Sequence, residues 1–179
     1  MGTWKTRGLR GSALEEYINY SNEKYRESGL ALIQKIPTPI TPIEIDKSTR
    51  HITLAYFEKK STVDYIGVVQ GIPVCFDAKE CANTSFSLAN VHEHQFKFME
   101  EFEKQGGIAF LIIFFKSLDK IIYLPLKDLK FFFDRMNTGG KKSFKYEELD
   151  EEYLIPKKGD IIVHYLESLS SVSYTHLTL

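Results

Sequence analysis

Two runs of strand-forming residues, separated only by a Gln-Gly pair at 70–71, predict a tight β-hairpin near the middle of the chain. Residues 63–69 and 72–79 are rich in valine, isoleucine and aromatic residues, which favour β-strands, and a Gln-Gly pair fits a two-residue turn. Because such a turn fixes the pairing register, counting outward from it places Asp64 opposite Asp77. Any fold of this chain is therefore expected to hold two carboxylates side by side.

These two carboxylates need a positive charge between them. Side chains that face each other across a strand pair lie about 5 Å apart, so two anions there repel each other. A divalent metal supplies the missing charge, and hard oxygen ligands suit Mg²⁺. The two-residue period of a strand adds Thr62 and Lys79 to the same face, and a lysine beside a metal can stabilise negative charge on a phosphate under attack. The alternative is that the D-x12-D-x-K spacing arose by chance on a solvent-facing strand.

Composition predicts one globular domain. The chain has 179 residues, of which 43% are hydrophobic and 13% aromatic, and this is enough apolar mass for a core. A formal net charge of −1 counts mildly against a nucleic-acid binder. The cations are nevertheless clustered, although any one cluster can also be an ordinary solvated surface. These clusters are Lys5/Arg7/Arg10, Lys47/Arg50, Lys59/Lys60, Lys141/Lys142/Lys145 and Lys157/Lys158.

The cysteines and the apolar runs predict a cytoplasmic protein. Cys75 and Cys81 are too few and wrongly spaced for a disulfide framework or a zinc site. The longest apolar run, Ile108–Phe115, is too short to span a bilayer and is typical of a buried central strand. No apolar segment opens the chain as a signal peptide would. Residues 172–179 read as the translation of a sequencing adaptor, which leaves an expected single domain over residues 1–171.

Periodicity and turn residues predict the remaining elements. Ser12 and Glu15 have the form of a capping box and predict a first helix behind them. A β-ribbon is expected around the turn Asp46–Thr49, within a stalk of about residues 40–57. Further expected strands are 31–36, 85–88, 108–115 and 121–124, and further expected helices are 91–104, 126–136 and 161–169.

Two polar residues on these helices have two readings each. Glu15 serves either as the third residue of a capping box or in an active site, and its sequence context favours neither. Gln95 shares the otherwise apolar face of the helix expected at 91–104. A buried glutamine there is either satisfied by backbone groups or reserved for a site.

A string of motifs in this order resembles the RecU family, the Holliday junction resolvases of Gram-positive bacteria. The resemblance covers about residues 10–169, and the combination is far more specific than any one motif. It implies an α/β fold of the PD-(D/E)XK restriction-endonuclease-like type, with a mixed central sheet flanked by helices and a protruding β-ribbon stalk. It also implies a homodimer that nicks four-way junction DNA with Mg²⁺, for which Mn²⁺ can substitute. The motifs are Arg10-Gly11, Leu14-Glu15-Glu16, Lys35-Ile36-Pro37-Thr38-Pro39, Ser61-Thr62-Val63-Asp64-Tyr65, Phe76-Asp77-Ala78-Lys79-Glu80, Thr84-Ser85-Phe86 and His92-Glu93-His94-Gln95.

The resemblance also implies roles for single residues and partners. Lys79 is the expected stabiliser of the transition state, and Glu15 matches an acidic position in the first helix of related archaeal resolvases. The ribbon is the expected contact to the junction centre, and the RecA recombinase and a branch-migration motor are the implied protein partners. The expected metal-site residues are Thr62, Asp64, Asp77 and Gln95. The expected DNA-binding residues are Lys47, Arg50, Arg10, Lys59 and Lys60.

Two other functions stay open, and a departure from the family pattern bears on the first of them. Asp77 stands where many family members carry glutamate, which shortens this arm by one methylene. A DNA-binding recombination modulator with a decayed nuclease site is one alternative. A restriction-type or phage nuclease on the same fold, which would cut linear duplex DNA, is the other.

Overall fold

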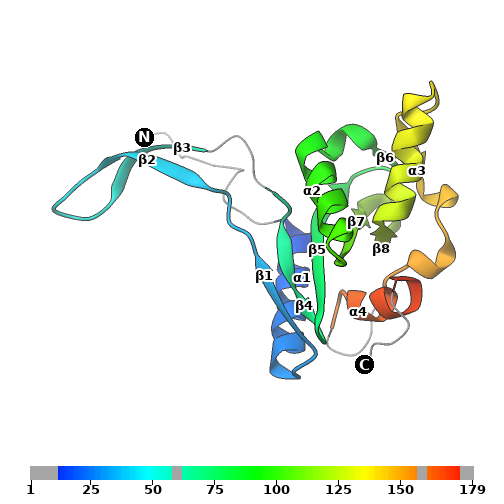
Figure 1. The fold of residues 1–179 in the computed structure, drawn as a ribbon, viewed down its shortest axis with the longest axis horizontal. Helices are drawn as coiled ribbons and strands as arrows, with labels where there is room; N and C mark the ends of the chain where they lie inside the picture. Colours follow the sequence, from blue (N-terminus) through cyan, green and yellow to red (C-terminus); the bar gives the residue numbers. More distant parts are fainter. Residues whose placement is uncertain (1–11, 58–61, 157–160, 174–179) are drawn as a thin grey trace.

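The computed structural model describes residues 12–57, 62–156 and 161–173. Four helices and nine strands make up the regular structure of these residues (Figure 1). The helices are α1 Ala13–Glu27, α2 Glu93–Lys104, α3 Leu126–Asn137 and α4 Tyr165–Ser168. The strands are β1 Ala31–Lys35, β2 Ile40–Ile45, β3 Ile52–Phe57, β4 Tyr65–Val69, β5 Ile72–Cys81, β6 Ser85–Ser87, β7 Ile108–Phe115, β8 Lys120–Pro125 and β9 Ser143–Lys145.

Five strands form a mixed central sheet in the order β1-β4-β5-β7-β8. The pair β5 and β7 is parallel, with α2 in the connection between the two strands, and the other neighbouring pairs are antiparallel. Both faces of the sheet are covered by helices (Figure 1). This confirms the α/β architecture that the resemblance to RecU implies, with a mixed sheet flanked by helices.

Each face of the sheet has its own hydrophobic core. On one face, Met99 of α2 and Phe132 of α3 pack with Cys75 of β5. On the other face, Leu14 of α1 packs with Phe76 of β5, and α4 belongs to the same core. Since side chains alternate along a strand, the odd-numbered residues of β5 point toward α2 and the even-numbered residues point toward α1.

The ribbon of β2 and β3 leaves the body between β1 and β4 and projects away from it (Figure 1). Its strands pair in an antiparallel register with irregularities around Glu44. The side chains of Ile52, Leu54 and Tyr56 are each about half exposed, at 47%, 48% and 53%. The ribbon thus has no sheet or helix packed over these apolar side chains within the described residues, and the prediction of a protruding ribbon is confirmed.

Two helices begin later than predicted, and two helix ends differ from the prediction by one residue, at Asn137 and Ser168. The helix expected from residue 91 begins at Glu93, because His92 has an extended backbone and serves as the N-cap. The helix expected from residue 161 begins at Tyr165, because His164 has a non-helical ψ of 57°. In both cases a buried apolar residue, Val91 or Val163, precedes the helix and extends the apolar pattern beyond its start.

The remaining expectations concern the cysteines, the membrane and the end of the chain. Both cysteines are buried and free. Among the helices described, none has the length and apolar character needed to cross a membrane. Most of the tail expected at 172–179 lies outside the described residues, which end at Ser173.

Candidate active site

The hairpin of β4 and β5 has the predicted register. Val69 pairs with Ile72 and Tyr65 with Phe76, across a turn whose two residues have positive φ angles of 47° and 89°. Such angles are typical of the two-residue turns that match the twist of paired strands. The ladder ends at Tyr65, so the prediction that the strand includes residues 63–64 is wrong, although their position beside β5 is correct.

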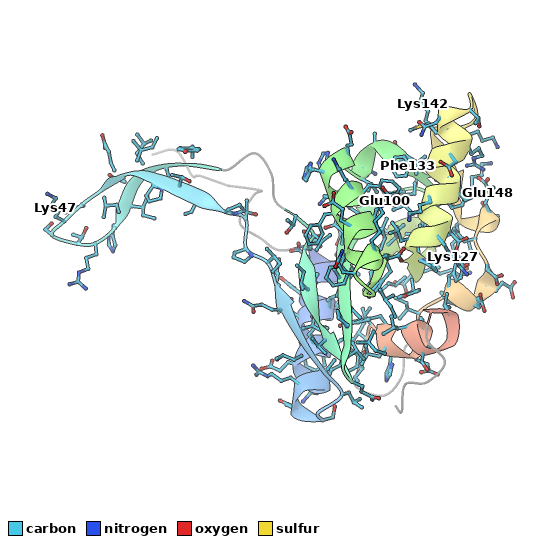
Figure 2. All side chains as sticks on the ribbon, viewed as in Figure 1. Lys47, Glu100, Lys127, Phe133, Lys142 and Glu148 are labelled. Atoms are coloured by element: carbon cyan, nitrogen blue, oxygen red, sulfur yellow. The ribbon has the colours of Figure 1, made fainter. Side chains whose placement is uncertain are left out.

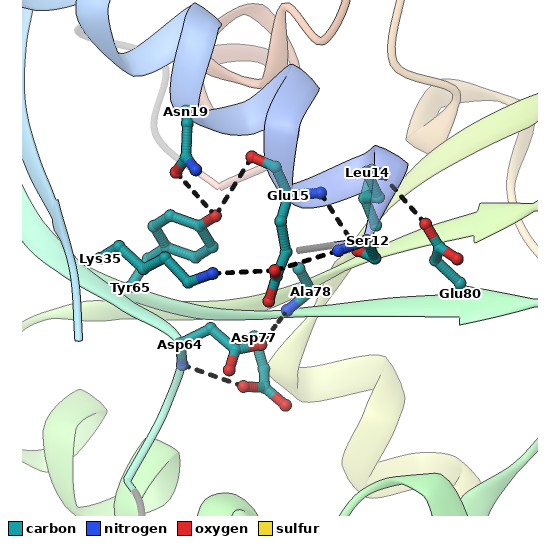
Figure 3. A network of polar contacts seen from close by, with 10 residues as sticks. All are labelled: Ser12, Leu14, Glu15, Asn19, Lys35, Asp64, Tyr65, Asp77, Ala78 and Glu80. Carbon is teal, nitrogen blue, oxygen red and sulfur yellow. Dashed lines mark hydrogen bonds and ion pairs between the residues drawn. The ribbon is translucent and has the colours of Figure 1, made fainter. Parts of the chain in front are cut away.

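Asp64 and Asp77 lie side by side at the end of this ladder (Figure 3). The backbone N–H of Asp64 donates to Oδ1 of Asp77 at 3.0 Å, and the N–H of Ala78 donates to Oδ2 of Asp64 at 2.9 Å. Asp77 is completely buried, and Asp64 is partly buried. Backbone groups of the hairpin therefore hold both carboxylates in place.

Lys79 supplies a positive charge to this pair. Its Nζ atom lies 2.6 Å from Oδ2 of Asp77, and 18% of its side chain is exposed. This Oδ2 atom is buried and accepts no hydrogen bond among the described residues, so its contact is the ion pair. One lysine thus faces two carboxylates, which leaves the cluster one positive charge short of neutrality.

The shortage of positive charge and the burial of the site both affect the pKa of Asp64. This pKa is raised to about 7, first by burial and then by the charge of Asp77 and a hydrogen bond to Asp77. The N–H of Ala78 and the ammonium of Lys79 act against this rise. A group with a pKa near 7 is only partly ionised at neutral pH. A bound divalent cation would keep both carboxylates ionised. Carboxylate oxygens are ligands that Mg²⁺ prefers, so the two aspartates fit this ion.

Gln95 lies beside Lys79 on the same side of the sheet. Its Oε1 atom accepts from Nζ of Lys79 at 3.4 Å and from the backbone N–H of His92 at 3.3 Å. The side chain is buried. Gln95 therefore caps α2 through a backbone N–H group, which is one of the two roles expected for it, and it also contacts Lys79 beside the aspartates.

Thr62 lies two residues before Asp64, partly buried and outside the strands. The structure therefore brings Asp64, Asp77, Lys79 and Gln95 into contact and places Thr62 next to them along the chain. Within the described ranges, no group of three or more His, Cys, Asp or Glu side chains is arranged to hold a metal. A bound Mg²⁺ would accordingly keep several waters, which is common for this ion.

Glu15 belongs to a second polar network on the α1 side of the sheet (Figure 3). Its Oε2 atom accepts from the N–H of Ser12 at 3.2 Å and lies 2.8 Å from Nζ of Lys35. Oγ of Ser12 accepts from the N–H of Glu15 at 3.2 Å, which completes the capping box. The capping prediction for Glu15 is confirmed, and its role in an active site stays a prediction.

Two residues of this second network were missed from the sequence. Lys35 reaches Glu15 across 20 residues, and Oε1 of Glu80 accepts from the N–H of Leu14 across 66 residues. Glu80 follows Lys79 in β5 but points to the opposite face, toward α1. Strand alternation after Lys79 would have given the direction of Glu80, although not its partner.

The DNA-binding residues predicted on the ribbon lie at its tip. Lys47 and Arg50 are both exposed, and Figure 2 shows Lys47 at the end of the ribbon, far from the body. Oδ1 of Asp46 accepts from the N–H groups of Ser48 and Thr49 at 2.8 and 3.3 Å, which fixes the turn. The other predicted DNA-binding residues, Arg10, Lys59 and Lys60, lie outside the described residues.

A separate hollow of about 720 Å³ lies between α2 and α3. It has an apolar floor, and Glu100, Phe133 and Lys142 are among the residues that line it (Figure 2). None of the predicted site residues lines this hollow. The hollow is therefore separate from the candidate site at the end of the hairpin.

The sequence comparisons with known proteins agree on one family. The family model described as recombination protein U matches residues 9–171. A Holliday junction resolvase RecU of Pediococcus pentosaceus is 44% identical over 170 residues, which cover 92% of this chain and 85% of the relative. The protein of the same name from a Geobacillus species is 38% identical over 174 residues, with 94% and 87% covered. Among solved structures, the archaeal resolvase Hjc of Archaeoglobus fulgidus aligns with a TM-score of 0.41 and 6% identity, over 63% of this chain and 77% of that one.

Proposed function

The chain belongs to the RecU family, and on that premise we propose that it is a Mg²⁺-dependent endonuclease that resolves Holliday junctions. The observation that carries this proposal is the pair formed by the buried Asp77 and the partly buried Asp64, with Lys79 against it. Relatives that match most of this chain are named Holliday junction resolvases. A decayed nuclease would have no need to keep a charged cluster at a cost in stability.

We assign the metal site to four residues. The carboxylates of Asp64 and Asp77 are the principal ligands, and the hydroxyl of Thr62 and the side-chain carbonyl of Gln95 complete the set. When bound, Mg²⁺ neutralises phosphate charge and lowers the pKa of a coordinated water. Backbone N–H groups of the hairpin already position the two aspartates among these residues, so these two carboxylates need little reorganisation before the reaction.

Lys79 stabilises the negative charge that develops on the phosphate. Its ammonium is held from two sides, by Asp77 at 2.6 Å and by Oε1 of Gln95 at 3.4 Å. A fixed cation in a partly buried site acts more strongly than one in water, because less solvent screens it. Gln95 can therefore contribute by orienting Lys79 as well as by binding the ion.

The ribbon provides recognition of the branched substrate. Lys47 and Arg50 at its tip are placed to contact phosphates at the centre of a junction, while the body holds a scissile phosphodiester. Arg10, Lys59 and Lys60 extend the proposed contacts to DNA. Glu15 is proposed as an additional acid of the site, reached from α1.

The assembly follows from the reaction. Resolution of a four-way junction requires two matched cuts, and a two-fold symmetric homodimer supplies two equivalent sites. RecA recombinase and a branch-migration motor are the proposed protein partners, and the cytoplasm is the proposed compartment.

A cleavage assay tests this function directly. The substrates are a four-way junction and a linear duplex built from the same sequences, each incubated with Mg²⁺, Mn²⁺ or EDTA. Lys79→Ala is the catalytic variant, and Lys97→Ala, which removes an exposed lysine of α2, is the matched control. We expect paired nicks in the junction with metal, from the wild type and the Lys97 variant only.

Two other outcomes point to the alternatives. Junction binding without cleavage in either metal, by protein shown to be folded, would identify a recombination modulator with a decayed site. Equal cleavage of junction and linear duplex would identify a restriction-type or phage nuclease.

A further inference from the structure

Glu80 occupies the back of the strand that carries the proposed catalytic residues. It follows Lys79 in β5, and strand alternation directs it to the face covered by α1. Only 18% of its side chain is exposed. Its two carboxylate oxygens have different partners: Oε1 accepts from the N–H of Leu14 at 3.0 Å, and Oε2 forms an ion pair with Lys116.

The contact with Leu14 completes the cap of α1. The first N–H groups of a helix have no partner within the helix. Oγ of Ser12 accepts from Glu15 in the same turn, whereas Leu14 is satisfied from outside the helix by Glu80 (Figure 3). An anion at this end is also favoured by the helix dipole. The start of α1 is thus attached to β5 through one side chain.

The contact with Lys116 brings in a third element. Lys116 directly follows β7, whose last residue Phe115 pairs with Cys81 at the end of β5. Glu80 therefore joins the start of α1, the end of β5 and the end of β7. The front of the same stretch of β5 presents Asp77 and Lys79 to the proposed metal site.

We propose that Glu80 is a positioning residue for this active site. It clamps α1 and the end of β7 against β5, and so fixes the backbone from which Asp77 and Lys79 project. The same clamp fixes the first turn of α1, where Glu15 lies. This inference rests on the proposed nuclease function, and it concerns a residue whose side chain pairs with Leu14 and Lys116 on the face of the sheet covered by α1.

Three variants separate the contacts of Glu80. Glu80→Ala removes both, Glu80→Gln keeps an oxygen that can accept from Leu14 but loses the charge, and Lys116→Met removes the ion pair alone. Glu16→Ala is the matched control, because Glu16 is an exposed acid in the first turn of α1. For each protein we would measure single-turnover cleavage of a four-way junction, the dissociation constant for the junction in EDTA, and Mn²⁺ binding by calorimetry.

The expected pattern is a loss of rate without a loss of binding. A displacement of about 1 Å at a reacting group costs on the order of a hundredfold, so Glu80→Ala is expected to lower kcat by about tenfold or more, with junction affinity within about twofold of wild type. Glu80→Gln should lower kcat by no more than about threefold, Lys116→Met, which keeps the charged contact with Leu14, should lose no more than Glu80→Gln, and Glu16→Ala should match wild type. Mn²⁺ binding should weaken by about threefold or more in Glu80→Ala and should be unchanged in Glu80→Gln.

Several outcomes overturn the proposal. They are a wild-type kcat in Glu80→Ala, an equal loss in Glu80→Gln and Glu80→Ala, or parallel losses of rate and junction binding. If Glu80→Ala does not fold, Glu80→Gln and Lys116→Met decide in its place: a measurable loss of kcat with unchanged junction binding supports the proposal, and a wild-type kcat in both overturns it. If the wild type cuts no junction, the proposed function fails, and Mn²⁺ binding alone then decides the role of Glu80.

Discussion

Replacing Asp64 with asparagine separates the stability of the fold from the chemistry of the site. Asparagine has the shape of a protonated aspartate, so it can still accept from the N–H of Ala78 and can donate to Asp77. The wild-type carboxylate must instead lose its proton next to another buried anion. We therefore expect Asp64→Asn to stabilise the metal-free protein at neutral and alkaline pH while it abolishes cleavage.

The size of the gain follows from the pKa of Asp64. Burial and Asp77 raise it from 3.8 to about 7, and each unit is worth about 1.4 kcal/mol, which sets a ceiling of about 4 kcal/mol. Asp64 is only partly buried, so solvent and relaxation reduce this, and we expect about 2 kcal/mol. In a chain of this size that corresponds to a rise in Tm of about 4–8 °C.

The pH dependence gives the decisive signature. Because the pKa is higher in the folded state than in the unfolded state, the folded wild type holds the proton more tightly and loses stability as pH rises from about 4 to about 7. The advantage of Asp64→Asn should therefore be absent below about pH 4 and complete above about pH 7. Urea unfolding in EDTA across this range measures it. An asparagine variant less stable than wild type at alkaline pH, or a difference that does not vary with pH, would refute the reasoning.

Three further results are expected. Asp77→Glu restores the longer acid that the resemblance implies, so it should cleave junctions in Mg²⁺ at least as well as wild type in the same cleavage assay. Inactivity of both folded proteins in Mg²⁺ and in Mn²⁺ would favour a decayed site. Replacing both Lys47 and Arg50 with alanine should weaken binding to junctions more than binding to linear duplex. It should also lower the slope of log affinity against log salt concentration by about two, one for each lost phosphate contact. Equal losses on both substrates would leave the ribbon without a role in selectivity. Gly67→Ala should destabilise the protein by about 3 kcal/mol in urea, because a Cβ atom there would lie 2.2 Å from the backbone oxygen of Leu32; unchanged stability would mean that β1 can shift.

The proposed site was predictable where local geometry determines it. A two-residue turn fixes the register of the hairpin, so the approach of Asp64 to Asp77 followed from counting residues outward from the turn. The capping box at Ser12 was predictable for the same reason, because its partners are three residues apart. The nuclease assignment itself came from the resemblance to RecU, and no single motif was specific enough to give it.

The unpredicted part of the site depends on contacts between distant segments. The pairing of Glu80 with Leu14 and of Lys35 with Glu15 requires α1 to pack against the sheet at one particular position. Sequence pattern gives the face on which a side chain lies but not the element that meets it. The predicted start of α2 was two residues too early for a related reason. Val91 is buried but has an extended backbone, so its apolar side chain continued the helical pattern into a segment that is not helical.

The ribbon is an insertion within a hairpin. Lys35, the last residue of β1, pairs with Tyr65, the first residue of β4, so the two strands meet again where the ribbon begins and ends. A short turn could therefore join them directly and leave the register of the central sheet unchanged. Closing the shorter loop would also cost less entropy, by roughly 2 kcal/mol for a reduction from about thirty residues to about four. The ribbon and the central sheet are thus separable in this fold, and the ribbon can be lengthened, shortened or exchanged without rebuilding the strands that hold Asp64 and Asp77.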